Sequence, residues 1–191
     1  MKRGKFISLE GGEGVGKSTQ LLALAEQLRC RGLDVVTTRE PGGSPGAEWI
    51  RQLLLGGQDD RWSARAEALL FAAARTDHVE RTIRPALDRG AWVLCDRFLD
   101  SSLAYQGGAG GLGIEDVRGI NLFGMGETMP DRTLLLLLPQ GAERALARDA
   151  GDSDRIGGRA ADYHAAVAAA FRKIASAEPS RVRPVDAQGP V

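Results

Sequence analysis

Residues 11–18 have the composition and spacing of a loop that binds phosphate. Glycines at positions 11, 14 and 16 are followed by Lys17 and Ser18. Glycine lets the backbone turn with positive φ and approach a phosphate, so that successive N–H groups point at the anion. The apolar run Phe6–Leu9 before the loop and a helical pattern after it are the context that a P-loop requires. The sequence therefore predicts binding of ATP or GTP, with Lys17 on the β/γ-phosphates and Ser18 on Mg²⁺.

Two further strand ends carry charged residues. Arg39 follows the β-branched run Val35–Thr38, and Asp96 and Arg97 follow the apolar run Ala91–Cys95. Ligands of an open α/β sheet bind at the carboxyl ends of its strands, so these side chains are expected beside the P-loop. An aspartate there orients the Mg²⁺ shell, and a guanidinium suits a second anion. The alternative is that Arg97 only pairs with Asp96 and that Arg39 lies on a surface turn.

Phe71 and Arg75 lie four residues apart in a helical stretch and therefore share a face. An aromatic ring beside a guanidinium suits a flat base and its polar edge. On spacing alone, a core phenylalanine next to a solvated arginine is the stronger explanation, because amphipathic helices often show such pairs. His78, one turn further, is expected to be structural.

A cluster of arginines occupies a glycine- and aspartate-rich segment. Its members, with Asp154 beside them, are Arg144, Arg148, Arg155 and Arg159. Arginines in a loop that closes over a transferring phosphoryl group accelerate the reaction by about 10³–10⁵-fold. The segment 149–159 is therefore a candidate lid, and the alternative is a salt-bridged surface loop.

Five apolar runs alternate with helical stretches along the chain. The runs, each expected to be a strand, are Phe6–Leu9, Val35–Thr38, Ala91–Cys95, Thr133–Leu138 and Val182–Val185. Continuous apolar runs are typical of strands buried on both faces of a parallel sheet. The sequence predicts an α/β fold in one domain, residues 1–191, with a five-stranded parallel sheet flanked by helices.

The helical pattern is clearest in three segments. They run from Lys17 to about Arg31, from Ala47 to Leu55 and from Ala64 to Leu87, the last bent near Pro85. The glycine-rich stretch 107–113, like the segment 149–159, is expected to be mobile.

The composition is that of a globular protein whose basic and acidic residues balance. The 191 residues are 43% hydrophobic and carry 25 basic and 25 acidic side chains, so neither nucleic acid nor a membrane is an expected partner. Cys30 and Cys95 are expected to be small core residues in a reducing compartment. The N-terminus lacks an apolar signal segment and the run Leu134–Leu138 is too short to span a bilayer, so the expected location is cytoplasmic.

Together these motifs resemble those of bacterial thymidylate kinases. The matching segments span nearly the whole chain in the family's order: Phe6-Ile7-x-Leu9-Glu10-Gly11-x-Glu13-Gly14-x-Gly16-Lys17-Ser18-Thr19, Arg39-Glu40-Pro41-Gly42-Gly43-Ser44, Leu70-Phe71-x-x-x-Arg75, Asp96-Arg97-x-x-x-Ser101-Ser102-x-Ala104-Tyr105-Gln106-Gly107 and Asp154-Arg155-Ile156. The P-loop is generic, whereas the second and fourth segments are specific. The resemblance implies a P-loop NTPase fold of the nucleoside monophosphate kinase type, with a lid, and the reaction Mg·ATP + dTMP → ADP + dTDP.

The resemblance also implies which residues bind ATP and perform the chemistry. ATP would be held by Gly11, Gly12, Glu13, Gly14, Val15, Gly16, Lys17, Ser18 and Thr19. Mg²⁺ would be held by Ser18 and Asp96. The catalytic residues would be Lys17, Asp96, Arg97 and, in the lid, Arg155.

The acceptor dTMP would be bound by a second set of residues. Arg39 and Arg97 would hold its phosphate, and Glu13 its 3′-hydroxyl. Thymine would stack on Phe71 and bond to Arg75. The pocket would be completed by Ser102 and Gln106, which line the base or sugar, and by Tyr105, which favours deoxyribose.

Other functions stay open at this point. Another nucleoside monophosphate kinase or a deoxynucleoside kinase is the nearest alternative, because the geometry of the acceptor pocket decides the substrate. A GTP-dependent switch would need Asn-Lys-x-Asp, and the single asparagine, Asn121, is followed by Leu122. A scaffold without activity is disfavoured by the intact Lys17, Asp96 and Arg97. The family resemblance further implies a homodimer formed by helix packing.

Overall fold

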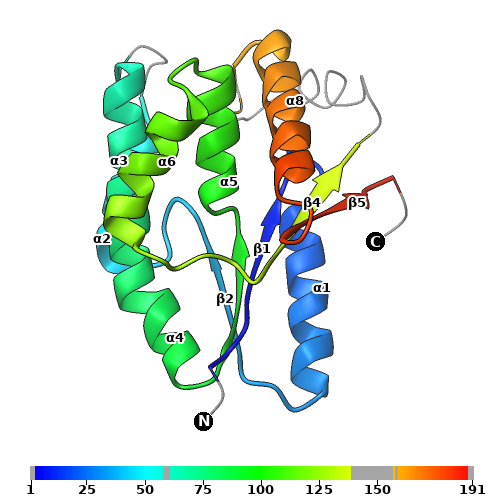
Figure 1. Ribbon diagram of the computed structural model, residues 1–191. Coiled ribbons are helices and arrows are strands. Elements are labelled where there is room, and N and C mark those ends of the chain that lie inside the picture. Colours follow the sequence, from blue (N-terminus) through cyan, green and yellow to red (C-terminus); the bar gives the residue numbers. More distant parts are fainter. Residues whose placement is uncertain (1–2, 58–60, 139–156, 158, 189–191) are drawn as a thin grey trace.

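The centre of the molecule is a five-stranded sheet in which every strand pairing is parallel (Figure 1). The computed structural model describes residues 3–57, 61–138, 157 and 159–188. The strands are β1 (Phe6–Glu10), β2 (Val35–Arg39), β3 (Trp92–Asp96), β4 (Arg132–Leu137) and β5 (Val182–Asp186). Their order across the sheet is β2-β3-β1-β4-β5. The predicted fold class is confirmed, and each predicted strand boundary is within one residue.

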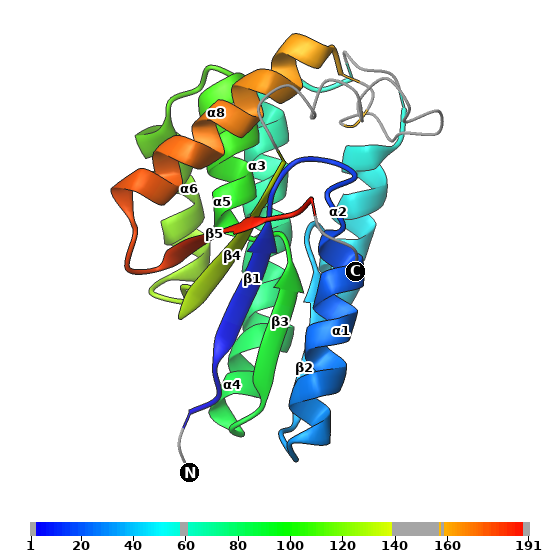
Figure 2. The same cartoon turned by 90° about the vertical axis from the view of Figure 1, so that its right-hand side faces the viewer.

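The sheet is covered by helices on both faces (Figure 2). The helical segments are α1 (Lys17–Cys30), α2 (Pro45–Leu55), α3 (Ala64–His78), the π-helix η1 (Val79–Ile83), α4 (Arg84–Asp88), α5 (Leu99–Ser102), the π-helix η2 (Leu103–Ala109), α6 (Ile114–Met125) and α8 (Ala161–Ala177). Successive side chains of each strand point to opposite faces of the sheet, so the core has two parts, one on each face. Val93 and Cys95 of β3 pack with η1, η2 and α8, whereas Leu94 faces the opposite way and packs with Leu21 and Ala25 of α1.

Three expectations about helices need correction. The helix expected at Ala47 begins at Pro45, because the Ser44 side chain accepts a hydrogen bond from the Ala47 N–H and proline is favourable in a first turn. The segment expected from Ala64 to Leu87 extends to Asp88 and contains a π-helical turn just before Pro85. In the stretch 107–113, which was expected to be mobile, residues 107–109 form the end of the regular π-helix η2.

The two cysteines differ in their surroundings. Cys95 is fully buried, as expected, but Cys30 is exposed at the end of α1, so its assignment to the core was wrong. In the described part of the chain, no helix combines the length and the apolar character needed to cross a membrane.

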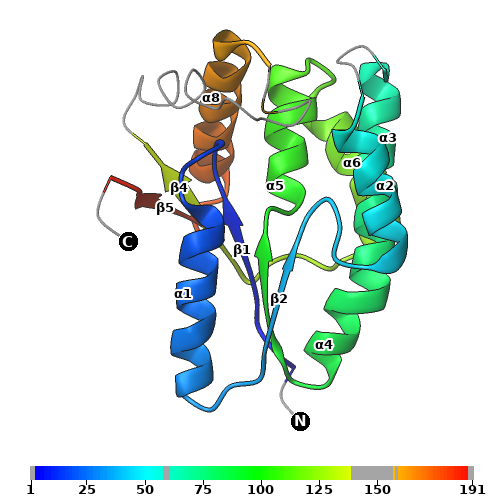
Figure 3. The same ribbon diagram turned by 180° about the vertical axis from the view of Figure 1, so that it is seen from behind.

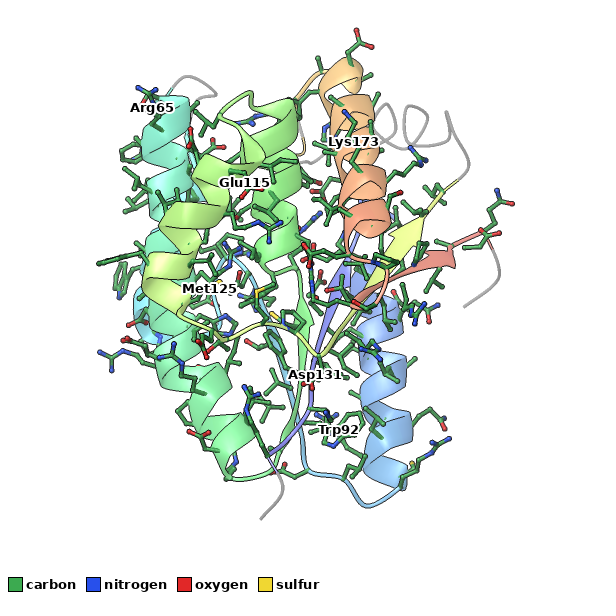
Figure 4. The ribbon with its side chains drawn as sticks, in the orientation of Figure 1. Arg65, Trp92, Glu115, Met125, Asp131 and Lys173 are labelled. Atoms are coloured by element: carbon green, nitrogen blue, oxygen red, sulfur yellow. The ribbon has the colours of Figure 1, made fainter. Side chains whose placement is uncertain are left out.

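The carboxyl ends of the central strands meet at one edge of the sheet. In the sheet register, Asp96 at the end of β3 lies opposite Leu9 of β1 on one side and Arg39 of β2 on the other. Figure 4 shows Trp92 and Asp131, at the start of β3 and just before β4, near the opposite edge. The polar residues that end the strands are therefore gathered on one side, as the sequence predicted.

The packing of α6 on α3 generates a first test. A Cβ on Gly124 would lie 1.8 Å from Thr76 Oγ1, whereas a Cβ on Gly119 of the same helix meets nothing within 4 Å. We expect Gly124→Ala to reduce the free energy of unfolding by about 1–3 kcal/mol, since the helices must separate. Gly119→Ala, the matched control, should raise it by about 0.5–1 kcal/mol through helix propensity. Urea denaturation measures both, and equal effects would refute this packing.

Candidate functional site

The loop between β1 and α1 has the backbone of an anion-binding turn. Gly11, Gly14 and Gly16 all have positive φ, and Gly16 is the left-handed N-cap of α1. A Cβ on Gly11 would come 2.4 Å from the Leu136 carbonyl oxygen, so a side chain at position 11 would force the loop away from β4. The Val15 side chain packs into the core on the α1 face. The loop is therefore anchored on one side, and its N–H groups and the N-terminus of α1 are available to bind an anion.

Lys17 begins α1 and folds back over the loop. Its Nζ donates a 2.6 Å hydrogen bond to the Gly12 carbonyl oxygen. Burial, and next the positive charge of Arg97, lower the pKa of Lys17 to about 8, against the attraction of Glu13. An anion placed in the loop would raise this pKa again and stabilise the ammonium.

Ser18 and Asp96 come together from different elements. The Ser18 hydroxyl donates a 2.5 Å hydrogen bond to Asp96 Oδ2 across the β1–β3 edge. Both groups offer hard oxygen atoms, and Mg²⁺ bound beside phosphates typically takes only one or two carboxylates from a protein. The pair fits the predicted metal ligands Ser18 and Asp96.

Arg97 holds the P-loop and the β3 end together. It is the only non-glycine residue with positive φ among those the structure describes, at 69°. Its Nη1 donates to the Gly11 carbonyl oxygen at 3.0 Å, and its Nη2 donates to Glu13 Oε1 at 2.7 Å. The Tyr105 ring lies 5.2 Å from the guanidinium carbon and its hydroxyl also bonds to Glu13. The ion pair of Arg97 is with Glu13, so the alternative in which Arg97 only pairs with Asp96 is wrong.

The Glu13 side chain is an ionised hydrogen-bond acceptor. Burial alone would raise the pKa of Glu13, but the Arg97 guanidinium and the Lys17 ammonium outweigh it and keep the pKa below its usual value. Glu13 therefore stays ionised next to Arg97 and can accept a hydrogen bond from a ligand hydroxyl.

Glu10 is a site residue that the motif analysis did not assign. It is fully buried at the end of β1, and its two oxygens accept hydrogen bonds from the Phe98 N–H at 2.7 Å and the Ser101 hydroxyl at 2.6 Å. Ser101 in turn accepts from Arg97 Nη1. One carboxyl group thus fixes the turn that carries Arg97. A charged residue at the end of an apolar strand was the available sequence signal.

A pocket of about 210 Å³ opens between these residues and the α2–α3 side of the molecule. Its walls include Glu13 and Ser18 at the P-loop, Asp96 and Arg97 at the β3 end, and the predicted acceptor residues Arg39, Phe71, Arg75, Ser102, Tyr105 and Gln106. The structure therefore brings together every predicted acceptor residue.

Arg75 is not the solvated residue that its spacing favoured. It is 2% exposed, and its guanidinium donates to Glu40, Ser102, Asn121 and the Phe98 carbonyl oxygen. Glu40 also bonds to Nδ1 of the fully buried His78, so the expectation of a structural His78 is confirmed. Phe71 lies half-buried in the pocket wall.

Two residues of the pocket wall, Arg39 and Gln106, form polar contacts with neighbouring side chains. Arg39 is more than half exposed and pairs with Glu48 at 3.1 Å. Gln106 donates to Glu67, whose other oxygen accepts from Arg159 at 2.7 Å. Of the predicted arginine cluster, Arg144, Arg148 and Arg155, with the neighbouring Asp154, lie outside the described residues.

Comparisons with known proteins agree with this geometry. The family model for thymidylate kinase matches residues 9–191. The chain is 62% identical over 188 residues to the thymidylate kinase of Rhizorhabdus wittichii, with 97% of this chain and 90% of the relative covered. It is 50% identical over 189 residues to that of Caulobacter vibrioides, with 98% and 90% covered.

The chain belongs to the thymidylate kinase family. A solved structure supports the fold as well: the thymidylate kinase of Ehrlichia chaffeensis superposes with a TM-score of 0.79 at 31% identity, covering 96% of this chain and 91% of that one. The resemblance drawn from the motifs is confirmed, and the alternatives of a GTP switch and of another kinase family are not favoured.

The buried Glu10 makes stability depend on pH. Burial, and next the negative charge of Asp100, raise the pKa of Glu10 to about 8, against the hydrogen bonds from Ser101 and Phe98. In the unfolded chain the pKa is near 4.5, so the folded protein holds one more proton between these values. The contribution of Glu10 to the free energy of unfolding therefore decreases as pH rises from about 5 to 8.

Denaturant unfolding at several pH values measures this dependence. Glu10→Gln cannot ionise and should show a flatter profile than the wild type over the same range. Parallel profiles for the two proteins would show that Glu10 titrates normally.

Proposed function

We propose that this chain transfers the γ-phosphoryl group of Mg·ATP to dTMP, giving ADP and dTDP. The observation that carries the proposal is the position of Arg97. Its guanidinium is bound to the P-loop through Gly11 and Glu13 while it also lines the pocket that contains Phe71 and Arg75. A donor phosphate in the P-loop and an acceptor phosphate in the pocket would both lie beside it.

The phosphate donor, ATP, would be bound mainly by backbone groups. The N–H groups of residues 11–18 and the α1 N-terminus would hold the ATP phosphates, with Lys17 neutralising the β- and γ-phosphates. Ser18 and Asp96 would hold Mg²⁺, which would neutralise charge on the transferring group. Thr19, which follows Ser18 and is exposed, would be the last residue of the ATP site.

The phosphate acceptor, dTMP, would be bound by side chains. Arg39 and Arg97 would hold the dTMP phosphate, and Glu13 would accept from the 3′-hydroxyl. Phe71 would stack on thymine, and Tyr105 would fill the space of a ribose 2′-hydroxyl. Burial raises the pKa of Tyr105, so its hydroxyl stays protonated and donates to Glu13.

The chemistry requires positioning more than proton transfer. The acceptor phosphate is already anionic, so no strong general base is needed, and catalysis consists of alignment and charge neutralisation. Lys17 and Arg97 would share the developing charge with a lid arginine, for which Arg155 is our candidate. The free thiols of Cys30 and Cys95 fit a reducing compartment, and we assign the enzyme to the cytoplasm.

An ADP-release assay with a panel of acceptors tests the proposed reaction. We expect dTMP to be the best acceptor, and thymidine, which lacks the phosphate held by Arg39 and Arg97, to be inactive. Lys17→Ala should reduce turnover by on the order of a hundredfold or more, because charge on the transferring group loses its partner. Equal release with thymidine, or without any acceptor, would refute the assignment.

We further propose that the protein is a homodimer formed through α2, α3 and α6. Large apolar side chains are exposed on these adjacent helices, including Trp49 at 70%, Leu69 at 56% and Phe123 at 95%. Figure 3 shows the three helices side by side, with α1 on the other side of the molecule. Exposed apolar area of this kind marks association surfaces.

Light scattering coupled to gel filtration tests the dimer. Phe123→Glu should shift the mass from dimer to monomer because it places a charge in an apolar contact. Leu22→Glu on α1, 61% exposed in the wild type, is the matched control and should leave the mass unchanged. A wild-type monomer, or identical behaviour of both variants, would rule this surface out.

A further inference from the structure

A buried ion pair lies behind the turn that carries Arg97. Asp100, three residues after Arg97, pairs with Arg181, which immediately precedes β5. Arg181 Nη1 donates to Asp100 Oδ2 at 2.7 Å, and Arg181 Nη2 donates to Asp100 Oδ1 at 2.7 Å. The Asp100 side chain is 1% exposed and that of Arg181 is 12% exposed. Residues 81 positions apart in the sequence are therefore joined by a planar, two-point contact.

Both partners of this ion pair form further hydrogen bonds that fix them. Thr133 of β4 donates to Asp100 Oδ2 at 3.1 Å and accepts from Arg181 Nη1 at 2.8 Å. Because the Thr133 hydroxyl hydrogen is used in this way, the Ser8 hydroxyl of β1, 2.8 Å away, must donate to Thr133. Arg181 Nε donates to Glu178 Oε2 at 2.8 Å. A buried network in which the polar groups are paired is rigid, so it holds Asp100 in one position.

Asp100 and its neighbour Ser101 hold the first turn of α5 from different directions. Ser101 donates to Glu10 at 2.6 Å, accepts from Arg97 Nη1 at 3.1 Å and lines the pocket. Asp100 is not among the residues of the pocket wall, because successive side chains of a helix point to different sides. A displacement of Asp100 would therefore move Ser101 and, with it, a hydrogen-bond partner of the Arg97 guanidinium.

The turn needs support because its backbone is strained. Arg97 has a φ of 69°, and a non-glycine residue keeps such a conformation only where its surroundings determine it. The hydrogen bonds to the Leu9 carbonyl oxygen and to Glu10 fix the start of the turn against β1. The contact between Asp100 and Arg181 fixes the helical turn that follows, against β4 and the start of β5. The two sets of contacts together determine where the Arg97 side chain begins.

We propose that the Asp100–Arg181 ion pair keeps the Arg97 guanidinium in the orientation that binds the acceptor phosphate. Asp100 and Arg181 are positioning residues in this scheme, because they act through the turn and lie outside the pocket wall. The inference rests on the proposed function for the acceptor, dTMP, and for Arg97 as a ligand of its phosphate. The residue that precedes β5 thereby contributes to acceptor binding from behind the site.

The alternative role of this ion pair is to fasten β5 to the rest of the fold and nothing more. A buried ion pair is weak evidence for added stability, because the loss of hydration offsets much of the attraction between the charges. The two roles differ in their effect on ligands. A loss of stability reduces the folded fraction and weakens every acceptor equally, whereas a displaced Arg97 weakens only a ligand that carries the phosphate.

Binding calorimetry with dTMP and thymidine tests the inference without requiring turnover. Thymidine lacks only the phosphate, so the ratio of the two affinities reports on the phosphate contact. We expect the wild type to bind dTMP more tightly, and Asp100→Asn to reduce the dTMP-to-thymidine affinity ratio by about fivefold or more, because the weakened contact is charge-assisted. Arg118→Gln is the matched control. It removes the 3.1 Å hydrogen bond to Glu178 at the outer end of the same cluster and should leave the ratio unchanged.

A second variant, Arg181→Lys, guards against the failure of Asp100→Asn to fold. Lysine keeps a positive charge beside Asp100 but lacks the planar fork that bonds to both carboxylate oxygens. The dTMP-to-thymidine affinity ratio of this variant should decrease by about twofold or more, while its affinity for thymidine stays close to that of the wild type. If Asp100→Asn binds neither ligand, the ratio of the lysine variant decides.

Three results would overturn the inference. Variants at positions 100 and 181 that weaken dTMP and thymidine by the same factor would show a purely structural role and would leave the proposed reaction standing. A control variant at position 118 that lowers the ratio as much as Asp100→Asn would show that the effect does not come from this ion pair. A wild type that binds thymidine as tightly as dTMP would instead contradict the phosphate contact of Arg97, so the proposed function would fail first and the inference with it.

Discussion

The site depends on the attachment of Arg97 to the P-loop. A non-glycine residue with φ of 69° is disfavoured and persists only where its surroundings determine it. Here the backbone N–H of Arg97 bonds to Leu9 at 2.9 Å and its guanidinium bonds to Gly11 and Glu13. The strain is balanced by contacts that join two strand ends. As a consequence, the Arg97 guanidinium, which can bind a second anion, is held at a fixed position relative to the anion site of the P-loop.

Two buried glutamate carboxyl groups hold the two arginines of the pocket in place. Glu10 fixes the turn of Arg97 through Phe98 and Ser101, and Glu40 fixes Arg75. Each carboxyl group is fully or almost fully buried, and each has hydrogen-bond partners at both oxygens. Removing one partner from such a pair leaves an uncompensated buried group, so these contacts tolerate little variation. Both arginines therefore face the pocket with defined orientations.

The sequence predicted what local patterns encode. Strand boundaries, the P-loop and the meeting of Arg39, Asp96 and Arg97 followed from apolar runs and from the rule that ligands bind at strand ends. The surroundings of Arg75 did not follow, because a spacing of four residues identifies a shared helix face and not what packs against it. Glu10 and Glu40 find partners more than 30 residues away, which no local pattern records. Cys30 was misplaced for the same reason, since helix membership does not decide burial.

The central claim is that Arg97 is the acceptor phosphate's ligand as well as a clamp on the P-loop. Its most direct test is calorimetric titration of dTMP into the wild type and into Arg97→Lys, which keeps the charge but loses the planar fork. We predict that the affinity for dTMP decreases about tenfold or more, and that the affinity for ATP decreases by a smaller factor, because the P-loop loses part of its attachment to Arg97. Unchanged dTMP affinity in the lysine variant would contradict the account.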